Sequence, residues 1–157
     1  MTRTGASTGC WVECVQYEAN VDDMDPRIWP AVIERLLDVG AHDAWVTPIV
    51  MKKGRPAFTL GVLCDPDTAD DVRSTIFREC TTIRVRQTTA RKYVLDRTED
   101  AVEVEGRSIG VKTAMDDGQV VNRSVEWDDV VAAATALGLS AKEVLALATA
   151  EANRRSP

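Results

Sequence analysis

Residues 10–40 read CWVECVQYEANVDDMDPRIWPAVIERLLDVG, a stretch that encodes one strand followed by one capped helix. Apolar and aromatic residues within 10–19 favour a strand, because these residue types pack well on a pleated surface. Asp25 and Pro26 predict a helix start, since an aspartate accepts from free N–H groups and a proline fits the first helical position. Apolar residues then recur at helical spacing until Gly40, which predicts the helix end.

The next segment repeats this alternation of strand and capped helix. Asp65 and Pro66 form the same cap-and-proline pair, and the second helix is expected to end near Glu79. Three further strands are predicted, at residues 44–50, 58–64 and 83–86. The resulting order, β-α-β-β-α-β, is that of the ferredoxin-like split arrangement.

After residue 90 the apolar segments become short and alternate with glycine-containing turns. Ser124 is expected to cap one helix, and Ser140 with Glu143 forms a capping box at the start of another. Four short strands are predicted before these helices, at residues 93–95, 101–104, 108–111 and 119–121.

The predicted fold class is therefore α+β, in which a ferredoxin-like β-α-β-β-α-β half precedes a small antiparallel β subdomain with two C-terminal helices. We expect a flexible N-terminus over residues 1–9 and the ferredoxin-like subdomain over 10–89. The small β-roll subdomain with its two helices is expected over 90–157.

The charge of the chain is unevenly distributed. The 157 residues carry a net charge of −6, which argues against a protein that binds duplex nucleic acid. Residues 52–97 nevertheless hold ten cationic and six acidic residues, a net charge of +4, while the remainder carries −10. Such a basic segment suits a small, multiply anionic ligand, although a solvated, charged sheet face would have the same composition.

Neither a membrane partner nor a secretory signal is predicted. No apolar run approaches the roughly 20 residues of a membrane span, and residues 1–9 lack an apolar core.

Cys10 and Cys14 would share one face of a strand, and no second close pair supports a metal site. We therefore expect a cytoplasmic protein with reduced, mostly buried thiols, and a surface or structural role for His42.

An acidic segment precedes the first helix. Asp22 and Asp23 could bind a hard divalent cation such as Mg²⁺ or Mn²⁺, which is commonly shared between carboxylates and phosphate oxygens. They could equally stabilise the positive end of the helix, and the sequence leaves both options open. For Asp25 the capping role is favoured.

Two basic segments could bind phosphates. Residues 51–56 hold three cations around a glycine between two strands, which suits a polyphosphate or a plain solvated turn. Thr81 and Thr82 follow the second helix, and Arg84 and Arg86 alternate so that both are expected on one strand face. No Walker pattern and no nucleophile–base pair is visible, which favours positioning and charge neutralisation by a metal ion over covalent catalysis.

Three segments together closely resemble one family. They are EANVDDM at 18–24, TPIVMKKGRP at 47–56 and IFRECTTIRVR at 76–86. The family is LarC, the nickel-insertion protein of nickel-pincer nucleotide cofactor synthesis, and the match is to its C-terminal domain. The resemblance implies a CTP-dependent cyclometallase that inserts Ni²⁺ into pyridinium-3,5-bisthiocarboxylic acid mononucleotide while CTP is split to CMP and diphosphate.

The resemblance also implies partners and site residues. The C-terminal domain is expected to hold CTP with Mn²⁺ or Mg²⁺, to form a homo-oligomer and to act with an N-terminal LarC-type domain. Asp22 and Asp23 become candidate metal ligands. The candidate nucleotide-binding residues are Asn20, Lys52, Lys53, Arg55, Arg78, Thr81, Thr82 and Arg86. The alternative is a non-catalytic anion-binding regulatory or oligomerisation module.

Overall fold

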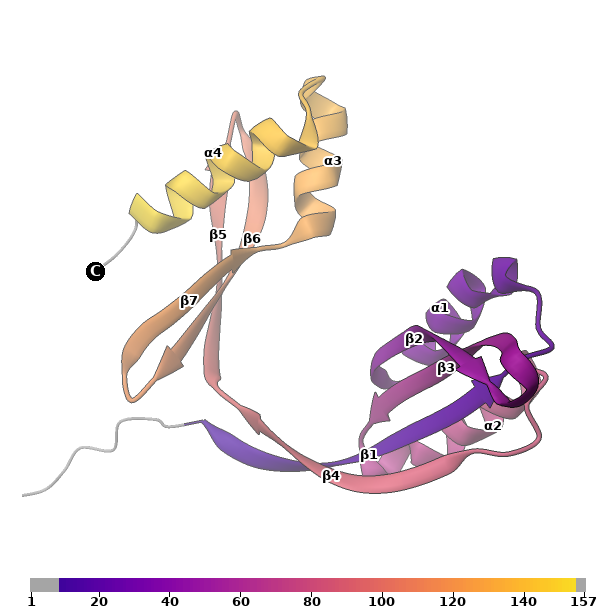
Figure 1. The fold of residues 1–157 in the computed structure, drawn as a ribbon. Coiled ribbons are helices and arrows are strands. Elements are labelled where there is room, and N and C mark those ends of the chain that lie inside the picture. The colour runs from indigo at the N-terminus through magenta and orange to yellow at the C-terminus, as the bar shows by residue number, and fades with distance from the viewer. Residues whose placement is uncertain (1–8, 155–157) are drawn as a thin grey trace, which may run out of the picture. The chain divides into compact units, whose positions relative to one another are not determined.

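The computed structural model describes residues 9–154 and contains two compact units (Figure 1). The first, called here the ferredoxin-like unit, comprises Trp11–Lys92. The second, the C-terminal unit, comprises the described residues from Tyr93 onward together with Gly9 and Cys10. Apart from Gly9, the N-terminus expected to be flexible lies outside the described residues.

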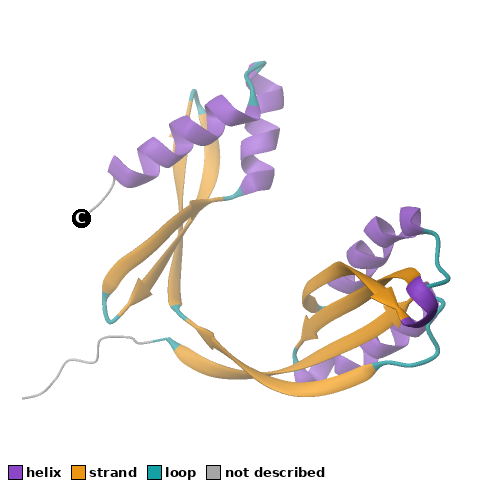
Figure 2. Ribbon diagram, viewed as in Figure 1, coloured by secondary structure: helices purple, strands orange, loops and turns teal. Residues whose placement is uncertain are grey.

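The ferredoxin-like unit is a four-stranded sheet with two helices, coloured by type in Figure 2. The strands have the order β2-β3-β1-β4, and β3 runs antiparallel to both β1 and β2, which confirms the predicted ferredoxin-like arrangement. Its elements are β1 Cys10–Val21, α1 Trp29–Asp38, β2 Ala41–Met51, β3 Arg55–Cys64, α2 Ala69–Glu79 and β4 Arg86–Val94.

The core of this unit lies between the helices and one face of the sheet. Alternate residues of β1, including Tyr17, pack with Trp29 and Leu36 of α1 and with Ile76 of α2. On the opposite face the Trp45 ring lies directly over Gly61, where an added Cβ would come within 2.3 Å of the ring. The glycine is thus required by close approach of an aromatic ring to the backbone.

The two predicted helix starts differ. Asp25 caps the short 3₁₀ helix Pro26–Ile28 by accepting from the Arg27 N–H at 2.9 Å, and hydrogen bonds from Arg27 lower the pKa of Asp25. The prediction of a side-chain cap at Asp65 is wrong. Its carboxylate instead lies 2.9 Å from Nε2 of His42, because the start of β2 brings the imidazole within reach.

The fourth strand begins later than predicted. The sequence predicts it at residues 83–86, whereas β4 is Arg86–Val94 and takes in all but the last residue of the strand predicted at 93–95. Ile83 lies in the preceding loop with 83% of its surface exposed. An apolar residue at this position therefore does not indicate a strand. Arg84 is in the same loop, which corrects its expected place beside Arg86 on one strand face. The real strand is polar because it lies at the sheet edge, where most of its side chains contact solvent.

The C-terminal unit is a three-stranded antiparallel sheet of order β5-β6-β7 with two helices. Its core contains only small or branched apolar residues, with Ile109 completely buried among valines and alanines. Residues of positive φ, Glu105-Gly106 and Asp117-Gly118, form the two predicted hairpin turns. Its elements are β5 Asp96–Val104, β6 Arg107–Asp116, β7 Gln119–Val125, α3 Trp127–Leu137 and α4 Ala141–Arg154.

The helix caps of this unit match one prediction and correct another. Ser124 lies in β7 and caps nothing, since the strand extends through Val125 and Glu126 occupies the N-cap position. The capping box is confirmed, because the Glu143 N–H donates to Ser140 Oγ at 3.2 Å and the Ser140 N–H donates to Glu143 Oε2 at 3.0 Å. Hydrogen bonds from Ser140 hold the pKa of Glu143 below its usual value.

Within residues 9–154 no single helix is long and apolar enough to cross a membrane. Only α3 and α4 taken together reach that length and composition, and they are bent by 119° at the break between them.

Candidate functional site

The ferredoxin-like unit contains a cavity of about 930 Å³ beside the end of β1 and the loop that leads from α2 into β4. Its size is within the range of small-molecule sites in proteins. Three chain segments far apart in sequence contribute to it. The lining residues are Asn20, Asp22, Asp23, Met51, Arg73, Phe77, Thr81, Thr82, Ile83, Arg84, Val85 and Arg86.

Two carboxylates that line this cavity are held by partners distant in sequence. Asp22 Oδ2 accepts from the Arg55 guanidinium at 3.0 Å, and Asp23 Oδ1 accepts from the Thr81 hydroxyl at 2.5 Å. The β2–β3 hairpin therefore orients one carboxylate, and the end of α2 orients the other. Each contact engages one carboxylate oxygen.

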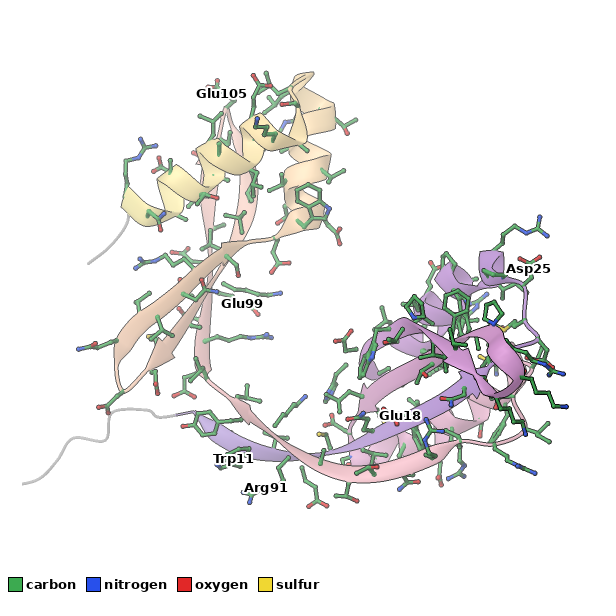
Figure 3. The ribbon with its side chains drawn as sticks, viewed as in Figure 1. Trp11, Glu18, Asp25, Arg91, Glu99 and Glu105 are labelled. Carbon is green, nitrogen blue, oxygen red and sulfur yellow. The ribbon has the colours of Figure 1, made fainter. Side chains whose placement is uncertain are left out.

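Arg86 is positioned by β1, the strand beside it in the sheet. Its guanidinium donates to Asn20 Oδ1 at 3.0 Å and to Glu18 Oε2 at 3.3 Å, and Thr59 of β3 donates to the same Asn20 oxygen at 3.0 Å. Figure 3 labels Glu18 on β1, close to the β4 ribbon. The Arg86 guanidinium, the Asn20 amide and the carboxylates of the two aspartates are thus held in the lining of one cavity.

The predicted residues do not all reach the cavity lining. Asn20, both aspartates, Thr81, Thr82 and Arg86 line it, whereas four predicted cations do not. Arg55 contacts the cavity only through Asp22, and Arg78 is held by Glu79 at 2.8 Å.

Lys52 and Lys53 follow directly after Met51, which lines the cavity. They form a short 3₁₀ turn in which Lys53 has the left-handed φ of 64°. Within the described part of the chain, neither ammonium group makes an ion pair or side-chain hydrogen bond. Both lysines therefore begin at the rim of the cavity and can turn toward a ligand without first breaking an ion pair.

Sequence reasoning missed Arg73 and Phe77 on α2. They are four residues apart on α2, so both project from the same side of the helix. Their spacing of four residues on a predicted helix is the feature of the sequence that could have identified them. Arg73 is paired with Asp70 at 2.8 Å, one turn earlier on the exposed helix surface.

The loop between α2 and β4 is fixed at three points. Cys80 is buried at its start, and Val85 packs against the core at its end. Between them the Thr82 hydroxyl donates to the Arg84 carbonyl at 2.8 Å and accepts from the Arg84 N–H at 3.3 Å. Ile83 is therefore held outward at the tip of an ordered turn.

The cysteines lie away from the cavity lining. Three of the four are buried, as expected, and burial raises the pKa of Cys80 to about 11, so its thiol stays protonated at neutral pH.

Among the described residues no group of three or more His, Cys, Asp or Glu side chains could hold a metal ion. A cation bound here would need oxygen atoms from a ligand in addition to the two aspartates.

Comparison with known proteins gives a consistent assignment. The family model described as nickel insertion protein matches residues 4–145. The pyridinium-3,5-bisthiocarboxylic acid mononucleotide nickel insertion protein of Nocardioides sp. strain JS614 is 53% identical over 85% of this chain and 34% of its own length. The protein of that name from Thermotoga sp. strain RQ2 is 39% identical over 83% of this chain and 32% of its own.

A solved structure matches almost completely. It is LarC2, the C-terminal domain of a cyclometallase involved in the synthesis of the NPN cofactor of lactate racemase, with a TM-score of 0.83 and 29% identity. The match covers 92% of this chain and 99% of that domain. The chain spans about a third of the length of the curated relatives it matches. Its sequence and fold place the chain in the nickel insertion protein family.

Proposed function

We propose that this chain is the CTP- and metal-binding C-terminal part of a nickel insertion protein. The full protein would insert Ni²⁺ into pyridinium-3,5-bisthiocarboxylic acid mononucleotide while CTP is split to CMP and diphosphate. The names of the relatives support the substrate and the metal. The observation that carries the nucleotide site is the convergence of Asp22, Asp23, Thr81 and Arg86 on one cavity.

The two aspartates fit a divalent cation that is shared with a phosphate chain. Mg²⁺ and Mn²⁺ take oxygen ligands, and Mg²⁺ is usually held by one or two carboxylates together with substrate phosphates. Arg55 and Thr81 engage Asp22 Oδ2 and Asp23 Oδ1, so the other oxygen of each carboxylate is available to a cation. The ion would neutralise phosphate charge near the bond that breaks.

The arginines and hydroxyls around the cavity fit the phosphates themselves. Arg86 and Thr82 line the cavity, and guanidinium groups bind phosphate oxygens in pairs. Lys52 and Lys53 can reach in from the rim beside Met51. Arg78 is a weaker candidate, because it must leave Glu79 before it can contact a ligand.

Nickel insertion itself would need the part of the relatives that this chain does not span. The nickel ion is cargo in this scheme, and the cavity offers it no thiol. We expect a cytoplasmic homo-oligomer that works with an N-terminal LarC-type domain. A separate anion-binding module remains the alternative outcome of the experiments below.

Calorimetric titration with CTP tests the nucleotide site. CTP should bind in the presence of Mn²⁺, and Asp23→Asn should weaken binding at least tenfold, since a hydrogen bond or contact to a charged group is worth roughly 1.5–3 kcal/mol. Asp38→Asn is the matched control, because Asp38 belongs to a surface ion pair with Arg35 and does not line the cavity. Absence of CTP binding with and without Mn²⁺ would refute the site.

Turnover separates an enzyme part from a binding module. The chain would be incubated with CTP, Mn²⁺, Ni²⁺ and the pyridinium substrate, with and without the N-terminal two thirds of the Nocardioides relative. CMP release only with that fragment supports half of a cyclometallase. CTP binding without CMP release in either mixture supports the regulatory module instead.

A further inference from the structure

Part of the cavity lining is apolar, and the phosphates and metal ion proposed above do not use it. Met51, Phe77, Ile83 and Val85 contribute this apolar surface to the cavity that the aspartates and Arg86 also line. Phe77 is 42% exposed and Ile83 is 83% exposed, so both leave large apolar side chains in contact with water. Exposed apolar surface gathered at a cavity is typical of a ligand-binding site.

The exposure of Ile83 is imposed by the backbone around it. Burial of Cys80 and Val85 anchors both ends of the loop in the core. The two hydrogen bonds between Thr82 and Arg84 fix the turn at its tip. Ile83 therefore cannot fold back onto the core without breaking these contacts, and a ligand in the cavity would bury its apolar side chain.

Phe77 lines the same cavity and supplies a flat aromatic surface there. It lies in the last turn of α2, and Thr81, which donates to Asp23, is four residues further along the chain, just past the end of the helix. Because Asp23 and Phe77 line one cavity, a ligand bound at Asp23 through its phosphates and metal ion can reach Phe77 with its other end. Planar heteroaromatic rings stack favourably on an aromatic side chain, largely independent of base identity.

We propose that Phe77 and Ile83 form an apolar clamp that binds the nucleobase of the nucleotide, with the triphosphate and its metal ion on the aspartate side. This inference rests on the proposed nucleotide site and adds the orientation of the ligand within it. The clamp recognises a planar ring, so it raises affinity for a nucleotide above that for its phosphate chain alone.

Two ligands and two variants test the clamp by calorimetry in the presence of Mn²⁺. One ligand is CTP, and the other is inorganic tripolyphosphate, which lacks the ring and the ribose. The wild-type chain should bind CTP more tightly than tripolyphosphate. Phe77→Leu should weaken CTP binding roughly 5- to 100-fold, the range for base stacking on aromatic residues. Ile83→Ser should also weaken CTP binding, because it removes apolar surface that the ring would cover. Both variants should leave tripolyphosphate affinity unchanged.

Val50→Ser is the matched control, because Val50 is a 76% exposed apolar residue of β2 outside the cavity lining. It should alter neither affinity. Unchanged CTP binding in both clamp variants, or an equal loss for CTP and tripolyphosphate, would overturn the clamp and leave the phosphate site standing. Failure of the wild-type chain to bind either ligand would overturn the clamp and the proposed function together.

Discussion

The polar contacts of the two units differ in how far along the chain they reach. Around the cavity of the ferredoxin-like unit, hydrogen bonds join residues 33, 58 and 66 positions apart, as in Asp22–Arg55, Thr81–Asp23 and Arg86–Asn20. In the C-terminal unit, the capping box Ser140–Glu143 joins residues three apart, and the Gly110 N–H donates to Asp129 Oδ2 across 19 positions. Contacts between segments far apart in sequence fix charges relative to one another in space. The greater reach of these contacts supports the binding role proposed for the first unit.

The apolar cores differ as well. The ferredoxin-like core contains wide side chains such as Tyr17, Trp29 and Leu60, whereas the C-terminal core is built from alanines, valines and Ile109. The Tyr17 hydroxyl and the Trp29 indole N–H are buried without a hydrogen-bond partner among the described residues. Large rings thus fill the space between sheet and helices in the first unit at the cost of two unsatisfied polar atoms.

The largest expected effect comes from the cores themselves. Leu60→Ala should lower the free energy of unfolding by roughly 2–5 kcal/mol, because Leu60 is fully buried on β3, one of the two inner strands. Ile109→Ala should cost a similar amount in the other unit. Denaturant unfolding measures both losses. Titration with Mn²⁺ and CTP at increasing denaturant concentration then compares the two variants. Leu60→Ala should lose CTP binding at a lower denaturant concentration than Ile109→Ala. Loss of binding at the same concentration in both variants would contradict the assignment of the nucleotide site to the ferredoxin-like unit.

Two surface ion pairs of similar geometry give the next contrast. Arg86 lies 3.3 Å from Glu18 in the ferredoxin-like unit, and Arg97 lies 3.4 Å from Glu99 in the C-terminal unit. Both arginines are more than half exposed, so Arg86→Gln and Arg97→Gln should each change stability by no more than about 1 kcal/mol. Only Arg86→Gln should weaken CTP binding, by about tenfold. A comparable loss in both variants would mean that general charge, rather than the cavity, governs affinity.

The smallest expected effect tests the local contacts. Ser140→Ala should destabilise the chain by about 1 kcal/mol, because α4 loses its N-terminal cap, and should leave CTP affinity unchanged. Thermal unfolding followed by circular dichroism measures the loss.

The same substitution should alter the dependence of stability on pH. Hydrogen bonds from Ser140 lower the pKa of Glu143, so the contribution of this carboxylate is present above its usual value of 4.5 and is lost as the pH falls through the lowered value. Thermal scans of the wild type between pH 6 and pH 3 should show this loss, and Ser140→Ala should reduce it. An identical pH profile in both proteins would contradict the role assigned to the box.

Much of the ferredoxin-like architecture could be predicted, because its signals are local. The Asp25–Pro26 start is fixed by hydrogen bonding within a few residues, and the strand–helix order follows from periodicity. β4 was misplaced because an edge strand has no apolar alternation, while the apolar residues of the preceding loop imitate one. Ser124 failed as a cap because strand pairing with β6 extends past it, which is a tertiary effect.

The candidate site was predicted in part for a related reason. Residue chemistry singled out Asp22, Asp23 and Arg86, since carboxylates and guanidinium groups suit metals and phosphates wherever they lie. Which cations line the cavity depends on strand register and helix rotation, and these leave Arg78 with Glu79 and bring in Arg73. The apolar side of the cavity gave no signal, because an exposed isoleucine resembles a core residue in sequence.

The contact between Trp45 and Gly61 has an evolutionary consequence. Any side chain at position 61 would displace the indole from the sheet, and a smaller residue at position 45 would uncover the glycine backbone on that face. Neither position can therefore drift alone without penalty, and a change at one favours a compensating change at the other. Descendants of this chain should thus exchange the aromatic ring and the glycine as a pair or keep both.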